Sequence, residues 1–141
     1  MDPVSVLLVD DNPTFLAILK RFLEQQHSHE VVILGMAGGG AEALIQAEKL
    51  RPNVVLMDLA MPGLSGLEAI PRLRAAMPGI GIIALTLLDP NGYRPPALAA
   101  GADVFVSKST LSTDLLLTIR RVARSTRSRK EPLSRPREVS T

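Results

Sequence analysis

Short apolar runs alternate along this chain with longer stretches in which apolar residues recur every three or four positions. The runs are rich in Val, Ile and Leu and predict β-strands at residues 4–9, 31–35, 53–57, 80–85 and 104–106. The longer stretches predict helices over about 13–23, 41–50, 67–77, a short one from the Pro95-Pro96 pair to Gly101, and 112–123. This regular alternation predicts an α/β domain whose parallel sheet is covered by helices on both faces.

Prolines fall inside two of the predicted helices. Pro71 lies in the middle of the third helix, where a missing N–H costs ~3 kcal/mol unless the helix kinks or starts late. Pro95 and Pro96 are expected to shorten the fourth helix. We therefore predict that the fourth helix starts no earlier than Arg94, after a mobile loop over residues 88–93.

Composition separates a mildly acidic body from a basic tail. The 141 residues suit one domain, and the lack of cysteine excludes disulfides, zinc–thiolate sites and thiol catalysis. Residues 1–123 contain ten Lys/Arg and twelve Asp/Glu, whereas residues 124–141 contain six Lys/Arg and two Glu among many Ser and Pro. We expect a disordered tail or linker from residue 124 onward. No apolar run is long enough to span a bilayer, so a cytoplasmic protein without membrane contact is expected.

Polar side chains follow four of the predicted strands. Asp10 and Asp11 come after the first strand, Asp58 after the third, Thr86 after the fourth and Lys108 after the fifth. Ligands of open parallel sheets bind beyond the carboxyl ends of the strands, so these residues are expected to converge there. Singly, each aspartate is better explained as a helix cap or turn residue.

The predicted cluster suits phosphoryl chemistry. Three carboxylates packed together repel, which favours either protonation or a bound divalent cation. Oxygen ligands without His or Cys suit Mg²⁺, which bridges readily to phosphate. One carboxylate could then attack phosphorus, while Lys108 supplies positive charge and Thr86 a hydroxyl donor for the phosphoryl oxygens.

Four sequence runs carry a resemblance to a known family. VLLVDDNPTF, PNVVLMDLAMPGLSGLEAI, IIALT and GADVFVSK resemble the receiver domains of two-component response regulators, and the resemblance covers about residues 4–123. The ending GADVFVSKST is similar to the LuxR/NarL-type subfamily. The resemblance implies a flavodoxin-like three-layer sandwich with five parallel strands in the order 2-1-3-4-5.

The resemblance also assigns roles around the acidic cluster. Asp58 would be the phosphoacceptor. Asp11 and Asp58 would ligate Mg²⁺ together with the backbone carbonyl of Ala60, and Asp10 would act through water. Together the cluster would form a Mg²⁺-dependent aspartyl phosphorylation site.

Two further residues match the switch positions of the family. Thr86 would be the switch hydroxyl and Phe105 the aromatic residue that follows it inward upon phosphorylation. Spacing alone favours a strand-end cap for Thr86 and plain core packing for Phe105.

Four residues depart from the family pattern. Ala60 replaces a polar residue, so its side chain cannot position a hydrolytic water. Leu87 and Leu88 are bulkier than the small residue often found after the switch threonine and could shield the phosphoryl group. Ser109 replaces the common proline after Lys108, so the peptide bond there need not be cis.

The resulting hypothesis is a signalling module rather than an enzyme. A sensor histidine kinase would donate the phosphoryl group, and phosphorylation would change a protein–protein surface, with homodimerisation as one outcome. EPLSRPREV resembles the entry to a LuxR/NarL-type helix-turn-helix domain, so DNA binding would require an output domain absent from this chain. The alternatives are a stand-alone relay or adaptor, a receiver that works without phosphorylation, and a metal-dependent phosphatase. The phosphatase would need a general acid two residues after Asp58, where this chain has Ala60.

Overall fold

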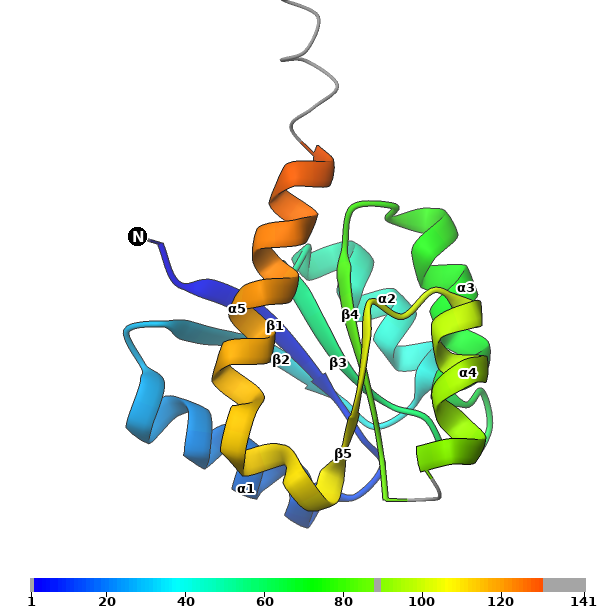
Figure 1. The fold of residues 1–141 in the computed structure, drawn as a ribbon, viewed down its shortest axis with the longest axis horizontal. Helices are drawn as coiled ribbons and strands as arrows, with labels where there is room; N and C mark the ends of the chain where they lie inside the picture. The colour runs from blue at the N-terminus through cyan, green and yellow to red at the C-terminus, as the bar shows by residue number, and fades with distance from the viewer. Residues whose placement is uncertain (1, 88–89, 131–141) are drawn as a thin grey trace, which may run out of the picture.

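Five parallel strands form one sheet in the order β2-β1-β3-β4-β5 (Figure 1). The protein is described by a computed structural model over residues 2–87 and 90–130. The strands are β1 Val4–Val9, β2 Val31–Ala37, β3 Val54–Asp58, β4 Gly81–Thr86 and β5 Val104–Ser107. The helices are α1 Pro13–His27, α2 Gly40–Leu50, α3 Gly66–Ala76, α4 Pro90–Ala100, the 3₁₀ turn η1 Lys108–Thr110 and α5 Leu111–Lys130. The predicted flavodoxin-like topology is confirmed.

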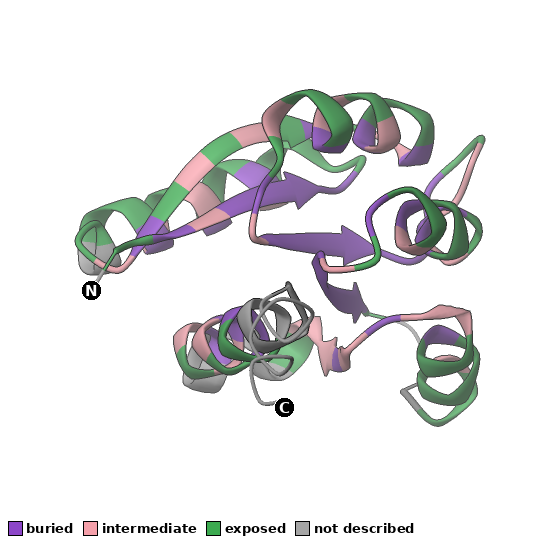
Figure 2. Ribbon diagram, turned by 90° about the horizontal axis from the view of Figure 1, so that it is seen from above, coloured by how far each residue is buried: buried purple, intermediate pink, exposed green. Residues whose placement is uncertain are grey.

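Helices cover both faces of the sheet and make two separate cores (Figure 2). One core packs α1 and α5 against the sheet, and the other packs α2, α3 and α4 against the opposite face. Every residue of β3 and β4 is buried, which explains why both strands read as continuous apolar runs. The predicted three-layer sandwich is therefore present.

The strand register brings the carboxyl ends of four strands together. Val9 of β1 pairs with Met57 of β3, and Asp58 pairs with Leu85 of β4. Thr86 pairs with Ser107 of β5, directly before Lys108. The polar residues that follow these strands consequently share one rim, at the lower edge of the sheet in Figure 1.

Helix α3 accommodates its internal proline without a late start. The helix begins at Gly66, five residues before Pro71. Ser65 and Glu68 form a reciprocal capping box, in which the Ser65 side chain accepts from Glu68 N–H and the Glu68 carboxylate accepts from Ser65 N–H. These two bonds satisfy orphan donors at the helix start and help offset the bond that Pro71 removes.

Helix α4 begins earlier than the sequence predicted. It starts at Pro90 rather than at or after Arg94, so residues 90–93 are helical; residues 88 and 89 of the predicted loop lie outside the described residues. Pro90 fits the first turn, where its missing N–H has no intrahelical partner in any case. Pro95 and Pro96 stand in the second turn, and the residues four positions before them are exposed to solvent.

Helix α5 also runs further than predicted. It extends to Lys130 instead of ending at Ala123, so residues 124–130, assigned to the tail from their composition, are helical. This segment contains no Gly or Pro before Pro132, and Arg and Lys propagate helices well. The remainder of the predicted tail, 131–141, lies outside the described residues. Among the residues that the structure describes, no helix is both long and apolar enough to cross a membrane.

Candidate functional site

Three aspartates meet at the rim of the sheet. Carboxylate oxygens of Asp10, Asp11 and Asp58 all lie within 4.8 Å of one another. Asp10 is 1% exposed and Asp58 is 4% exposed, whereas Asp11 faces solvent. Two buried carboxylates and one exposed carboxylate therefore surround a single small volume.

Lys108 reaches into this cluster from the end of β5. Its Nζ lies 2.5 Å from Oδ2 of Asp10 and 3.5 Å from Oδ1 of Asp58. The Lys108 side chain is only 8% exposed. The structure thus brings Asp10, Asp11, Asp58 and Lys108 together, as we expected from their positions at the carboxyl ends of the strands.

Backbone bonds hold the two buried carboxylates in place. Asp10 N–H donates to the Ala37 carbonyl at 3.0 Å, and the second oxygen of Asp10 accepts from Asn12 N–H at 2.9 Å. The Asp58 carboxylate accepts a hydrogen bond from the backbone N–H of Ala60. Each carboxylate is therefore oriented by the turn that follows its own strand.

Two glycines let the chain after β3 fold back tightly over the site. A Cβ on Gly66, the first residue of α3, would lie 1.9 Å from the Asp58 carbonyl oxygen. Gly40 N–H at the start of α2 donates to the Leu64 carbonyl at 3.0 Å, and a Cβ there would lie 2.4 Å from that same oxygen. Close backbone packing between α2, α3 and this loop fixes where Asp58 stands.

The electrostatics of the site are dominated by burial. The pKa of Asp58 is raised from 3.8 to about 6, chiefly by burial and next by repulsion from Asp10, while Lys108 and the Ala60 N–H act in the opposite direction. Three carboxylates outnumber the single ammonium of Lys108, so the site carries excess negative charge. Clustered carboxylate oxygens without His or Cys are the donor set that Mg²⁺ prefers, and the residues present fit such an ion.

Thr86 and Phe105 lie on one face of the sheet. Phe105 pairs with Ala84 and Ser107 pairs with Thr86, so the two-residue period of the strands points Thr86 and Phe105 to the same side. Thr86 is 1% exposed and Phe105 is 4% exposed. Phe105 belongs to the core cluster that includes residues of α4.

The positions that depart from the family pattern lie at the surface of the site. Ala60 is exposed, and Leu87 is 73% exposed. Leu88 lies outside the described residues, so shielding of a phosphoryl group by these leucines stays a prediction. The structure contains no cis peptide bond in the part of the chain that it describes, the bond before Ser109 included.

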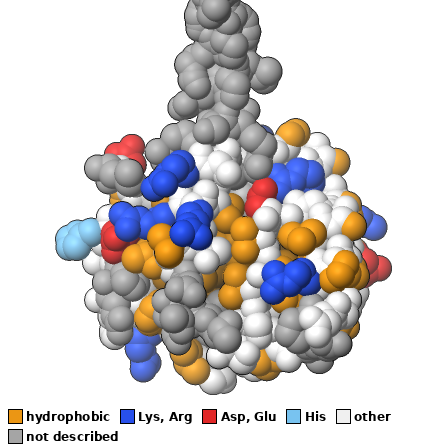
Figure 3. Space-filling view, viewed as in Figure 1, with side chains coloured by type: hydrophobic (Ala, Val, Ile, Leu, Met, Phe, Trp, Pro, Cys, Tyr) orange, Lys and Arg blue, Asp and Glu red, His pale blue; other side chains and the backbone are white. Residues whose placement is uncertain are grey.

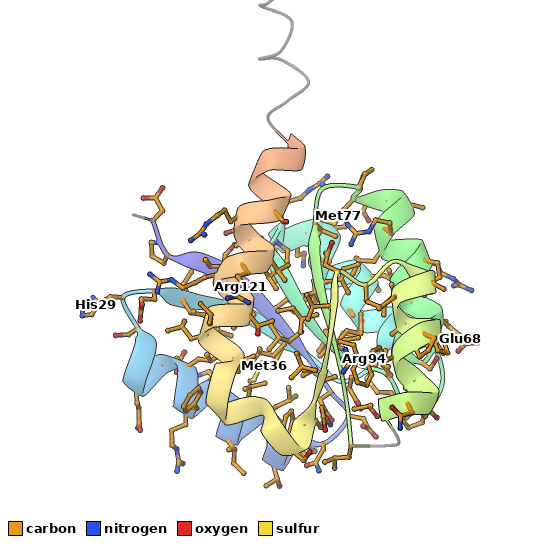
Figure 4. All side chains as sticks on the ribbon, viewed as in Figure 1. His29, Met36, Glu68, Met77, Arg94 and Arg121 are labelled. Carbon is orange, nitrogen blue, oxygen red and sulfur yellow. The ribbon has the colours of Figure 1, made fainter. Side chains whose placement is uncertain are left out.

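The structure adds two contacts that sequence reasoning missed. Lys108 Nζ lies 4.3 Å from the centroid of the Phe15 ring, and the guanidinium carbon of Arg94 lies 4.9 Å from the centroid of the Phe105 ring. Arg94 extends from α4 toward β5 (Figure 4). The only available signal for Phe15 was an aromatic residue in the first turn after the Asp10-Asp11 pair.

Comparisons with known proteins agree with this geometry. The model of the response regulator receiver domain family matches residues 6–120. The probable transcriptional regulatory protein TcrX of Mycobacterium tuberculosis is 34% identical over 124 residues, covering 88% of this chain and 51% of TcrX. The response regulator GacA of Pseudomonas protegens is 35% identical over 119 residues, covering 84% of this chain and 55% of GacA.

A solved structure gives the same result. The signal receiver domain of the putative response regulator NarL from Mycobacterium tuberculosis superimposes with a TM-score of 0.80 at 27% identity, covering 88% of this chain and 98% of that one. The chain spans about half the length of the curated relatives that it matches. From its sequence match and its fold, the chain belongs to the response regulator receiver domain family.

Proposed function

We propose that this chain is the phosphoacceptor receiver of a two-component system and that Asp58 accepts the phosphoryl group. The observation that carries the proposal is the placement of Asp58, which is buried beside Asp10 and Asp11 with Lys108 Nζ 3.5 Å away. Of the three carboxylates, Asp58 is the one at the centre of the sheet, between the rim residues of β1 and β4. A nucleophile there is enclosed by the charges that phosphoryl transfer requires.

The transfer is a displacement at phosphorus. An ionised oxygen of Asp58 attacks the phosphorus of a phosphohistidine on a sensor histidine kinase, the P–N bond breaks, and the imidazole nitrogen leaves with the bonding electrons. The product is an acyl phosphate on Asp58. Although burial raises the pKa of Asp58, the value of about 6 still lies below neutral pH, so most of the attacking carboxylate is ionised there.

The remaining rim residues stabilise the added charge. Asp10, Asp11, Asp58 and the backbone carbonyl of Ala60 would hold Mg²⁺, which when bound neutralises charge on the phosphoryl oxygens. Lys108 can move one N–H from a carboxylate to a phosphoryl oxygen without leaving the site. The Ala60 side chain offers no acid or base to activate water, which supports a carrier of phosphate over a turnover phosphatase.

The signal would leave the site through Thr86 and Phe105. A phosphoryl oxygen on Asp58 would draw the Thr86 hydroxyl, and Phe105 on the same face of the sheet would respond, changing the surface formed by α4, β5 and α5. Figure 3 shows hydrophobic side chains interspersed with Lys and Arg on this side of the molecule. Leu98 of α4 and Leu117 of α5 are exposed, and a surface with exposed apolar residues suits a homodimer of the phosphorylated form.

The output of the pathway is proposed to be transcription. TcrX is named as a probable transcriptional regulatory protein, and the aligned region covers only 51% of its length. A DNA-binding domain attached beyond α5 would receive the change at the α4-β5-α5 surface. The receiver itself would contact the kinase and a second receiver, and DNA only through that output domain.

Intact-mass analysis tests the phosphoacceptor. Incubation with acetyl phosphate and Mg²⁺ is expected to add one phosphoryl group to the wild type and none to Asp58→Ala, and EDTA is expected to prevent the addition. Asp11→Ala should need a higher Mg²⁺ concentration, while Asp2→Ala, an exposed aspartate before β1, serves as the control for loss of an aspartate. Addition to Asp58→Ala, or steady turnover of p-nitrophenyl phosphate by the wild type, would contradict the proposal.

A further inference from the structure

A short chain of contacts connects the first turn of α1 to the amine of Lys108. One oxygen of Asp10 binds Lys108 Nζ at 2.5 Å, and the other accepts from Asn12 N–H at 2.9 Å. The Asn12 side chain in turn accepts from the N–H groups of Thr14 and Phe15, at 3.0 and 3.2 Å. The turn that orients Asp10 therefore also fixes the backbone of Phe15, whose ring lies 4.3 Å from the Lys108 amine.

The Lys108 ammonium is surrounded by two carboxylates and an aromatic ring and has little contact with solvent. An ammonium has three donors and no acceptor. Two carboxylates lie within 3.5 Å of it, the Phe15 ring lies close by, and only 8% of the side chain remains exposed. Phe15 itself is half-buried and packs against the core formed by α1 and α5.

An aromatic face holds a cation differently from a carboxylate. Its quadrupole attracts the charge without taking up a hydrogen-bond direction. The amine can therefore exchange a carboxylate for another oxygen while it stays over the ring. A flexible four-carbon side chain that is confined in this way loses less freedom when it binds a new partner.

We propose that Phe15 is a positioning residue for Lys108, holding its amine at the acidic rim so that it meets the incoming phosphoryl group. The inference rests on the proposed function, because the amine has this task only if Asp58 accepts phosphate. In this role Phe15 acts through Lys108 and not directly on the phosphoryl group.

The first test compares two phenylalanines of the same helix. Phe22 lies seven residues, about two turns, beyond Phe15 and packs against the same core, so Phe22→Leu matches Phe15→Leu in chemistry and burial. Asp58 labelling by acetyl phosphate in Mg²⁺, followed by intact mass, is expected to be about three- to tenfold slower in Phe15→Leu. Phe22→Leu should stay within about twofold of wild type. Phe15→Tyr, which keeps the ring, should restore the rate.

A second test separates positioning from a general effect on the fold. In a Lys108→Met background, Phe15→Leu is expected to slow labelling by no more than about twofold, since the contact is already absent. Ring currents from Phe15 should also shift the ε-methylene protons of Lys108 upfield in NMR spectra of the wild type and Phe22→Leu, but not of Phe15→Leu. If Lys108→Met abolishes labelling, the NMR shift of the Lys108 ε-methylene protons alone tests whether Phe15 positions the amine.

Three results would overturn the inference. Equal labelling rates in Phe15→Leu and Phe22→Leu would show that the ring does not position the amine, although the proposed function would stand. An equal loss in the Lys108→Met background, or an unshifted ε-methylene signal in wild type, would assign Phe15 a purely structural role. Absence of labelling in the wild type would remove the proposed function, and the role of Phe15 with it.

Discussion

The guanidinium carbon of Arg94 lies 4.9 Å from the centroid of the Phe105 ring, so a charged group on α4 covers an aromatic residue of β5. Arg94 is exposed, whereas Phe105 is only 4% exposed. A cation over an aromatic face is attracted by the ring quadrupole. This contact joins the helix and strand that form the proposed output surface.

Replacement of Arg94 by alanine is expected to loosen α4. Loss of the cation–π contact should lower the free energy of unfolding by about 0.5–1 kcal/mol. Tyr93 is the only tyrosine, the chain has no tryptophan, and Tyr93 packs against the same core cluster as Phe105. Its fluorescence should therefore change in Arg94→Ala but not in Arg121→Ala, an exposed arginine of α5. Equal effects of the two substitutions would show that Arg94 contributes nothing specific.

The sequence predicted the sheet well because its strands are buried on both faces. Unbroken apolar residues at 54–57 and 82–85 leave little room for another structure, and parallel strands place their carboxyl ends together. The predicted ends of two helices were wrong. Helix α4 starts at Pro90, whereas the Pro95-Pro96 pair had suggested a later start, and α5 continues past Ala123 through residues that have no apolar pattern.

The rim residues were predictable, but the contacts around them were not. Asp10 and Lys108 directly follow strands and Asp58 ends one, and this gives each a definite place. The rings of Phe15 and Phe105 meet cations from distant segments only after helices pack on the sheet. The spacing of residues along the chain does not predict how the helices pack on the sheet, so these two contacts could be identified only from the structure.

Asp58 should make stability depend on pH in the absence of metal. Its pKa is 3.8 ordinarily and about 6 in the folded protein, so the folded state binds this proton more tightly than the unfolded state. The contribution favours folding below about pH 4 and is lost as the pH rises through 6. Above pH 7 the folded protein therefore carries an unfavourable ionised carboxylate.

Replacement of Asp58 by asparagine should remove this pH dependence. In buffer with a chelator, Asp58→Asn is expected to be more stable than wild type at pH 7.5, on the order of 2 kcal/mol. The difference should disappear near pH 4, where the wild-type carboxyl is protonated. Urea unfolding at both pH values measures it. A gain of the same size at pH 4 would mean that burial of charge is not its cause.

The first residue of α3 must be glycine for Asp58 to keep its place. Since a Cβ on Gly66 would lie 1.9 Å from the Asp58 carbonyl oxygen, Gly66→Ala has to displace either the helix or the end of β3. We expect a loss of about 1–3 kcal/mol in unfolding free energy and slower labelling by acetyl phosphate. Gly39→Ala is the matched control, because a Cβ there has no atom within 4 Å. Similar losses in both variants would exclude the steric explanation.

Arg74 connects three segments at the end of the molecule opposite the acidic rim. Its guanidinium donates to the Ile80 carbonyl before β4 at 2.5 Å and to the Gly101 carbonyl after α4 at 2.7 Å, and it pairs with Asp103 at 2.9 Å. Asp103 also accepts from the backbone N–H of Ile82 at 2.8 Å. The guanidinium of α3 is therefore the common donor for the residue just before β4 and for the turn between α4 and β5.

Replacement of Arg74 by alanine should destabilise the fold by about 2–4 kcal/mol, because half-buried carbonyls and a carboxylate lose a charged donor together. Arg74→Lys should recover little, since an ammonium cannot reproduce the planar fork that reaches several acceptors at once. Lys20→Ala, which removes an exposed ion pair with Glu24, is the contrasting control and should cost less than about 0.5 kcal/mol. Thermal unfolding of the three variants measures the difference. If Arg74→Ala unfolds like Lys20→Ala, these bonds do not hold the segments together.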